Sequence, residues 1–203
     1  DPRLAPVRDA MSRGAARGVF SLQLHGMEHF WPDCLLRGPV TSGPVRDWLL
    51  GRDVRDVDLV VEEAGGAEAL AAGLESASVR VTRHERFGTV AVAAPEAALD
   101  LATARRERYP HDGALPVVEP GSLEEDLLRR DFAVNALALP LSAAARRQRG
   151  GLVDPVKGVR DLERGVLRVL HRRSFHDDPT RALRAARLAP RLGFALARDG
   201  RTA

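Results

Sequence analysis

The chain has little cysteine, few aromatic residues and almost no lysine. Its 203 residues include one cysteine, two tryptophans, one tyrosine and a single lysine. One cysteine excludes an internal disulfide and is typical of a reducing compartment. No apolar run approaches the ~20 residues that a membrane-spanning helix needs, and residues 1–20 lack the apolar core of a signal peptide. We therefore expect a cytoplasmic protein without a membrane partner.

The charged residues that are present are distributed unevenly. The formal net charge is +3, but residues 1–100 carry 11 basic and 15 acidic side chains, whereas residues 101–203 carry 20 and 13. An acidic half followed by a basic half suits a metal site followed by a surface that contacts a polyanion. Because arginine is abundant throughout, charge alone favours that interpretation only slightly. The 44% hydrophobic content is sufficient for a buried core.

Hydrophobic periodicity predicts an α+β fold with a mixed sheet of about five strands and flanking helices. The predicted strands are 35–40, 56–61, 79–83, 89–93 and 98–103, and the predicted helices are 44–50, 67–74, 122–130 and 179–192. Prolines, glycines and polar residues between 105 and 121 predict a mobile loop. Ser122 and Glu125 have the spacing of a capping box at a helix start. Residues 143–151 have the composition of a hinge.

Two aspartates separated by one residue form the most informative pattern. Asp56 and Asp58 begin the apolar run DVDLVV, and alternate residues of a strand point to the same face, roughly 6.5 Å apart. Carboxylates paired in this way are oxygen ligands of the kind that Mg²⁺ prefers beside substrate phosphates. An isolated pair would more often consist of turn residues at a strand start. The preceding segment favours the functional interpretation.

That preceding segment reads SGPVRD from Ser42. Gly43 allows the backbone to approach a phosphate, and a proline is well tolerated at the first helical position. Arg46 could contact a phosphate while Asp47 complements the helix dipole. The alternative is an ordinary tight turn into a helix with an Arg–Asp pair on its surface. Neither a Walker A motif nor a dinucleotide-binding glycine motif occurs.

A third carboxylate, Asp100, lies between two leucines of a predicted strand and therefore projects away from them. It could complete a metal shell or activate an attacking hydroxyl. Pairing with Arg105 or Arg106 at the surface is an equally good interpretation.

Five segments in a fixed order resemble the class II tRNA nucleotidyltransferases, the CCA-adding enzymes, and their bacterial poly(A) polymerase relatives. The segments are GPVRD from Gly43 with DVDLVVE from Asp56, LATARRE from Leu101, LEEDLLRRDFAVNALA from Leu123, DPVKGVRDL from Asp154 and DDPTRALRAAR from Asp177. Each motif alone is weak, but the ordered set is specific.

The resemblance implies roles for the matched residues. Asp56 and Asp58 would hold Mg²⁺ in a two-metal site, with Asp100 as a weaker third catalytic carboxylate. The expected nucleotide-binding residues are Ser42, Gly43, Arg46, Arg130, Asp131, Asn135, Asp178, Arg181, Arg184 and Arg187. Among them, Asp131 and Asn135 would shape the ribose pocket, and Asp178 and Arg181 would select ATP or CTP. The three-residue spacing of the last three arginines independently predicts a basic stripe fit for a triphosphate.

The implied reaction adds CMP and/or AMP from CTP or ATP to the 3′ end of tRNA. A poly(A) polymerase and a non-catalytic nucleotide- or RNA-binding module stay open as alternatives. The implied domains are an N-terminal extension over 1–30, a catalytic nucleotidyltransferase head over 31–140, and the start of a helical neck over 141–203. The expected partners are ATP and/or CTP and the tRNA 3′ end.

Overall fold

The chain forms two compact units. The computed structural model describes residues 39–41, 43–52, 56–74, 79–84, 89–94, 97–140 and 151–197. Unit 1 comprises Asp1–Thr103 and Ala138–Val153, and unit 2 comprises Ala104–Leu137 and Asp154–Ala203. The expected head, neck and extension boundaries follow sequence motifs and stay a prediction. Residues 35–38 of an expected strand and most of the expected hinge lie outside the described residues.

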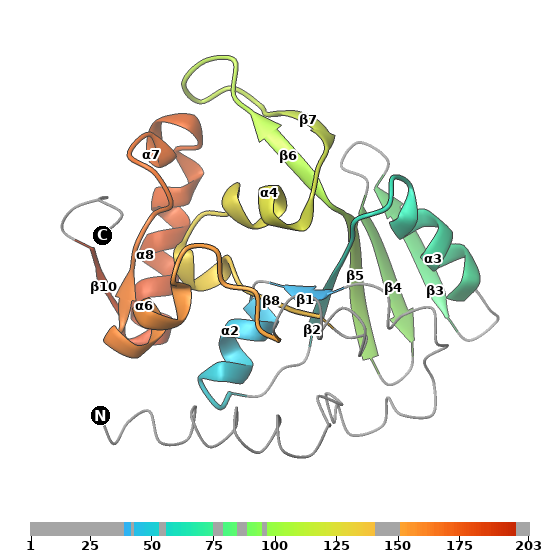
Figure 1. Ribbon diagram of the computed structural model, residues 1–203, viewed down its shortest axis with the longest axis horizontal. Coiled ribbons are helices and arrows are strands. Elements are labelled where there is room, and N and C mark those ends of the chain that lie inside the picture. The colour runs from blue at the N-terminus through green and yellow to red at the C-terminus, as the bar shows by residue number, and fades with distance from the viewer. Residues whose placement is uncertain are drawn as a thin grey trace. The chain divides into compact units, whose positions relative to one another are not determined.

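Unit 1 is built on a mixed sheet of six strands in the order β3-β4-β5-β2-β1-β8 (Figure 1). β2 and β5 pair in parallel, and the other neighbours pair antiparallel. The strands are β1 (Pro39–Thr41), β2 (Asp56–Val61), β3 (Arg80–His84), β4 (Thr89–Ala94), β5 (Ala97–Thr103) and β8 (Ala138–Pro140). The predicted α+β fold is confirmed, and β8 was missed because three residues are too few to show a period.

Strand alternation places the core of unit 1. Leu59 of β2 and Leu101 of β5 are buried, as are the equivalent residues Val57 and Leu99. Two helices cover the sheet: α2 (Gly43–Leu49) packs against β1 and β2, and α3 (Gly66–Leu74) packs against β4 and β5. Both helices match their predicted ranges to within one residue. The polar residues of β2 and β5 are therefore left on the other side of these strands.

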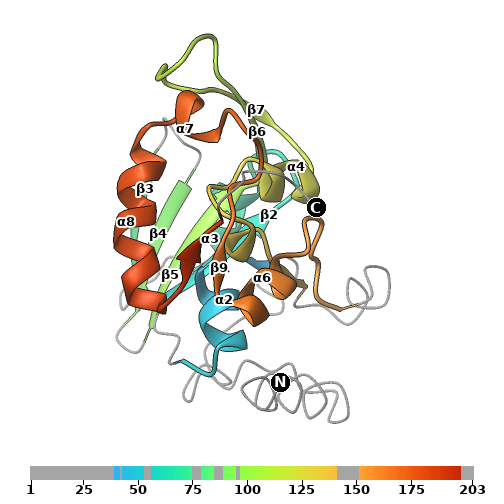
Figure 2. The same cartoon turned by 90° about the vertical axis from the view of Figure 1, so that its left-hand side faces the viewer.

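Unit 2 is assembled from a hairpin, several short helices and one longer helix, α8 (Thr180–Leu192). Its elements are β6 (Arg105–Arg108), β7 (Val117–Pro120), α4 (Leu123–Leu128), the 3₁₀ helix η4 (Ala133–Asn135), α6 (Gly158–Arg164), β9 (Val166–Leu167), α7 (Ser174–Asp177), α8 (Thr180–Leu192) and β10 (Ala195–Leu196). Figure 2 shows α7 at the N-terminal end of the long helix α8. No helix within the described ranges is both long and apolar enough to span a membrane.

The prediction of a mobile loop over 105–121 was wrong in part, because β6 and β7 form an antiparallel hairpin. Arg106 lies directly opposite Glu119 in the register, with 2.8 Å between Nη2 and Oε2. Opposite charges at facing positions stabilise a strand pair, so charged residues that look like coil in the sequence can form strands here.

The predicted capping box at the start of α4 is confirmed. The Ser122 hydroxyl accepts a hydrogen bond from the Glu125 N–H at 3.2 Å, and the Glu125 carboxylate accepts one from the Ser122 N–H at 2.8 Å. The Ser122 backbone donor lowers the pKa of Glu125. This cap fixes where the following arginine-rich segment begins.

A tight glycine contact fixes the start of α6. The Asp154 carboxylate accepts hydrogen bonds from the N–H groups of Gly158 at 2.6 Å and Val159 at 3.0 Å. A Cβ atom on Gly158 would overlap the backbone carbonyl of Ala133. Only glycine therefore fits between α6 and the segment that follows α4.

We predict that Gly158→Ala lowers the free energy of unfolding by about 2–3 kcal/mol, since backbone must shift to admit a methyl group. Urea unfolding followed by circular dichroism would measure the change. Gly73→Ala is the matched control, because Gly73 lies in α3 with open space around its Cα and should be neutral or slightly stabilising. Equal stability of the two variants would contradict the packing argument.

Candidate active site

In unit 1, the three predicted catalytic carboxylates lie on the adjacent strands β2 and β5, and two of them are register partners. Asp58 of β2 is the register partner of Asp100 of β5 in the parallel pair. Asp58 is half-buried and Asp100 is exposed, whereas Leu59 and Leu101, the next residues, are buried on the opposite face. Asp56 begins β2, paired with Ala98, but its side chain lies outside the described part of the structure.

This arrangement fits a hard divalent cation. The two positions that can be compared offer carboxylate oxygens on the same face of neighbouring strands, and Mg²⁺ prefers oxygen ligands. Within the described residues, no three histidine, cysteine or acidic side chains gather as a ready metal cluster. The fit to Mg²⁺ rests on the two carboxylates of Asp58 and Asp100, which the strand register places side by side. The two-residue period of a strand predicts that Asp56 points to the same face.

At the predicted phosphate turn, Gly43 is the first residue of α2, and Ser42 lies outside the described residues. Arg46 is only 5% exposed. Its Nε donates to Asp47 Oδ1 at 2.8 Å, so the Arg–Asp pair named as the alternative does form, although it is buried rather than on the surface. A Cβ atom on Gly43 would lie 3.6 Å from Arg46 Nη2. The guanidinium therefore lies against the glycine turn.

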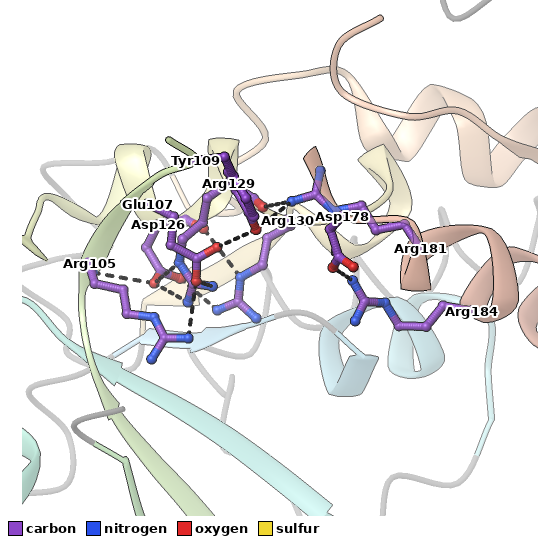
Figure 3. A network of polar contacts seen from close by, with 9 residues as sticks. All are labelled: Arg105, Glu107, Tyr109, Asp126, Arg129, Arg130, Asp178, Arg181 and Arg184. Carbon is purple, nitrogen blue, oxygen red and sulfur yellow. Dashed lines mark hydrogen bonds and ion pairs between the residues drawn. The ribbon is translucent and has the colours of Figure 1, made fainter. Parts of the chain in front are cut away.

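In unit 2, a buried carboxylate holds two arginines (Figure 3). Asp126 is completely buried, with Oδ1 at 2.6 Å from Arg129 Nη2 and Oδ2 at 2.6 Å from Arg130 Nη2. Its Oδ1 also accepts from the N–H of Arg105 at 3.4 Å. Burial by itself raises the pKa of Asp126, but the charges and hydrogen bonds of Arg130 and Arg129 outweigh it and hold that pKa below its usual value.

Glu107 holds the same arginine from the hairpin. Its Oε1 accepts hydrogen bonds from Arg129 Nη1 at 3.0 Å and from Arg105 Nη2 at 3.1 Å. The Tyr109 hydroxyl donates to Oε2 at 3.0 Å. Burial and the Glu107 charge raise the pKa of Tyr109. The Arg129 side chain is therefore held between carboxylates of α4 and β6.

Arg181, predicted to read the base, is buried at 2% exposure. It donates to Ser174 Oγ at 2.6 Å, to the backbone carbonyl of Arg129 at 3.0 Å and to the Tyr109 hydroxyl at 3.4 Å. Its guanidinium carbon lies 5.9 Å from the centre of the Tyr109 ring. The side chain thus links α8 to α7, to the end of α4 and to the hairpin.

Four other predicted nucleotide-binding residues form a second group. Asp131 accepts from Asn135 Nδ2 at 2.9 Å and forms an ion pair with Arg184 at 3.1 Å. Arg184 Nη2 also donates to Asp178 at 2.9 Å. Burial alone raises the pKa of Asp178, but hydrogen bonds from Thr180 and the Arg184 charge hold it below its usual value. Arg184 therefore bridges two carboxylates, that of Asp131 before η4 and that of Asp178 before α8.

The three arginines of α8 do not form one stripe. Arg181 is buried, Arg184 is intermediate and Arg187 is exposed. Three helical residues turn the chain by only about 300°, so positions 181, 184 and 187 rotate progressively from the interior to solvent. The prediction of a common face was wrong for this reason. Sequence reasoning also missed Glu107, Tyr109 and Asp126, although the i,i+3 and i,i+4 spacing of Asp126 to the two arginines is a usable signal.

Residues 40–168 match the poly A polymerase head domain family. The chain belongs to this family. The resemblance noted from the ordered motifs is thereby confirmed. This head-domain chain is also similar to curated tRNA-processing proteins. It is 49% identical over 165 residues to the A-adding tRNA nucleotidyltransferase of Aquifex aeolicus, covering 81% of this chain and 19% of that protein. It is 44% identical over 180 residues to the CC-adding tRNA nucleotidyltransferase of Deinococcus radiodurans, covering 84% and 46%.

Solved structures agree with the sequence matches. The head-domain chain superimposes with a TM-score of 0.63, at 43% identity, on a tRNA nucleotidyltransferase complexed with a primer tRNA and an incoming ATP analog, covering 80% of this chain and 44% of that one. A CCA-adding enzyme in complex with CTP gives a TM-score of 0.66 at 33% identity, covering 93% and 42%. The chain thus spans less than half the length of these relatives.

We predict that Asp126→Asn lowers the free energy of unfolding at pH 7 by about 3 kcal/mol, because two guanidiniums lose a buried partner. The folded pKa of Asp126 lies below its unfolded value. The ionised Asp126 side chain therefore contributes its full stabilisation of the folded state above about pH 4. This stabilisation is lost as the pH falls toward the pKa that Asp126 has in the folded protein. Urea unfolding between pH 7 and 3 should show that the difference in the free energy of unfolding between wild type and Asp126→Asn becomes smaller as the pH falls.

Asp161→Asn is the matched control for this titration. Burial raises the pKa of Asp161 despite its ion pair with Arg168. Wild type therefore gains stability as Asp161 becomes protonated, and the difference in the free energy of unfolding between wild type and Asp161→Asn should grow as the pH falls. If the stability difference between wild type and Asp126→Asn stayed constant from pH 7 to 3, the conclusion that Asp126 is an ionised, paired group in the folded protein would be contradicted.

Proposed function

We propose that this chain carries the nucleotidyl-transfer and nucleotide-recognition parts of a tRNA nucleotidyltransferase, which adds CMP and/or AMP from CTP or ATP to the 3′ end of tRNA. The observation that carries the proposal is the register pairing of Asp58 with Asp100 on adjacent parallel strands. Family membership and relatives named A-adding and CC-adding enzymes support it. The reaction is attack of an RNA 3′-hydroxyl on the α-phosphate, which releases pyrophosphate.

Unit 1 would supply the carboxylates. Asp56 and Asp58 would hold Mg²⁺, which when bound supplies Lewis-acid stabilisation of the phosphates and of the attacking oxygen. Asp100 lies beside Asp58 in the register and would accept the proton of the attacking hydroxyl or act as a further ligand. Arg46, held against the turn at Gly43, would neutralise a phosphate oxygen, with Ser42 completing the turn.

Unit 2 would supply nucleotide recognition. Arg130 and Arg184 offer partly exposed guanidiniums, which bind phosphate oxygens with paired donors. Asp131 and Asn135, already hydrogen-bonded to each other, would face the ribose hydroxyls. Asp178 would discriminate the bases, and the buried Arg181, its ion-pair partner at 3.7 Å, would act with it by orienting that carboxylate. The proposal also keeps Arg187 as an exposed phosphate contact.

The domain division belongs to the same proposal. Residues 31–140 would act as the catalytic head and residues 141–203 as the start of the neck, with 1–30 as an extension. A cytoplasmic site of action, where tRNA and nucleoside triphosphates are available as substrates, is proposed with it.

The central prediction concerns Asp58→Asn. Loss of one carboxylate charge should reduce CMP and AMP incorporation into a tRNA lacking its 3′ end by about 10³-fold or more, because the site would no longer neutralise Mg²⁺. Radiolabelled incorporation by the full chain measures the effect, and circular dichroism checks the fold. Glu68→Gln is the matched control, since Glu68 is an exposed unit 1 carboxylate paired with Arg83. Substantial residual activity of Asp58→Asn would refute the proposed site.

The added nucleotides can be identified from the product length. With CTP, ATP or both, a CCA-type enzyme should stop after a fixed number of additions to tRNA, whereas a poly(A) polymerase should extend diverse RNAs with ATP alone. The match to the poly A polymerase head family keeps that second function under test. Nucleotide binding without any extension would instead favour a non-catalytic module.

A further inference from the structure

The proposed reaction makes no direct use of Asp126, yet this side chain organises the arginines that it needs. It is the one carboxylate in the network of Figure 3 that is completely buried. Each of its oxygens lies 2.6 Å from a different guanidinium. Buried ion pairs of this kind are often no more stabilising than apolar side chains of similar size, so stability alone is a weak reason for its presence.

Arg130 is held at two points by the same residue. Its Nη2 donates to Asp126 Oδ2 at 2.6 Å, and its Nε donates to the backbone carbonyl of Asp126 at 3.3 Å. A long flexible side chain would otherwise lose up to about 2 kcal/mol of rotamer entropy on binding a phosphate. With both contacts in place, the guanidinium is oriented before the nucleotide arrives.

A second connection runs through Arg129 to the recognition helix. Asp126 and Glu107 together fix the Arg129 side chain, and the Arg129 backbone carbonyl accepts a hydrogen bond from Arg181 at 3.0 Å. The side chain of Arg181 is thereby placed by the same short segment that places Arg130. One buried charge thus influences both a proposed triphosphate contact, Arg130, and Arg181, the ion-pair partner of the proposed base contact Asp178.

We propose that Asp126 is a positioning residue that sets nucleotide affinity and the CTP-to-ATP preference by orienting Arg130 directly and Arg181 through Arg129. This inference rests on the proposed function. Three guanidiniums, those of Arg105, Arg129 and Arg130, face two carboxylates, those of Asp126 and Glu107. The cluster therefore keeps a net positive charge of about one unit, which attracts a triphosphate.

The test measures KM and kcat for CTP and ATP with the full chain, a tRNA acceptor and Mg²⁺. In Asp126→Asn the amide keeps the shape but cannot accept charge-assisted bonds from both arginines. We expect KM to rise by about 10-fold and the CTP-to-ATP ratio of kcat/KM to change by at least about 3-fold. A merely structural role would reduce the amount of active protein, lowering kcat and leaving KM and the ratio unchanged.

Two further variants guard against a simple folding defect. Asp161→Asn removes another buried aspartate that is paired with an arginine. It should leave KM and the CTP-to-ATP ratio of kcat/KM unchanged. Arg129→Lys keeps a positive charge but cannot reach Asp126 and Glu107 together. It should change the ratio in the same direction as Asp126→Asn, even if the latter folds poorly.

A double-mutant cycle tests the route of action. If Asp126 acts through Arg130, Asp126→Asn should raise KM much less in an Arg130→Gln background than in wild type. Additive effects, or wild-type KM and ratio in both Asp126→Asn and Arg129→Lys, would overturn the inference. Absence of incorporation by wild type would instead refute the proposed function, and this inference with it.

Discussion

The arrangement of unit 2 depends on a negative charge that is kept away from water. Moving a carboxylate into a protein interior costs several kcal/mol unless cations and hydrogen bonds compensate for the lost hydration. Asp126 obtains that compensation from Arg129, Arg130 and a backbone N–H of β6. Because these partners come from different segments, the hairpin and the end of α4 must come together before the charge is satisfied. The electrostatic requirement therefore orders elements that are too short to be stable alone.

The charge asymmetry noted in the sequence corresponds to two kinds of chemistry. The acidic first half contributes carboxylates on the face of β2 and β5 opposite the buried residues Leu59 and Leu101. The basic second half does not form a uniformly positive surface, since Arg181 is buried and several arginines are paired with acidic groups. Pairing leaves these guanidiniums ordered, and an ordered guanidinium binds a phosphate with less loss of entropy than a freely moving one. Net charge alone does not reveal this difference.

How far the sequence predicts the structure depends on how local each signal is. The alternation of β2 and the capping box of Ser122 and Glu125 involve neighbours within a few residues, and both were predicted correctly. The hairpin was missed because Arg106 is stabilised by Glu119 across the strand pair, a contact that periodicity cannot reveal. The orientation of Arg181 was missed for a similar reason, since its partners Tyr109 and Ser174 are distant in the chain. Buried charges become interpretable only when all their partners are known.

The way in which the chain returns to unit 1 has a consequence for its synthesis and its modularity. Strand β8 pairs with β1, close to the start of the described chain, and the first segment of unit 2 lies between them in sequence. During translation β1 would thus remain an open sheet edge until residue 140 has left the ribosome, and open edges are prone to unwanted pairing. Since the backbone passes between the units three times, no single proteolytic cut can release either one intact. Recombination between related chains could exchange one unit alone only by joining the backbone at all three of these passages.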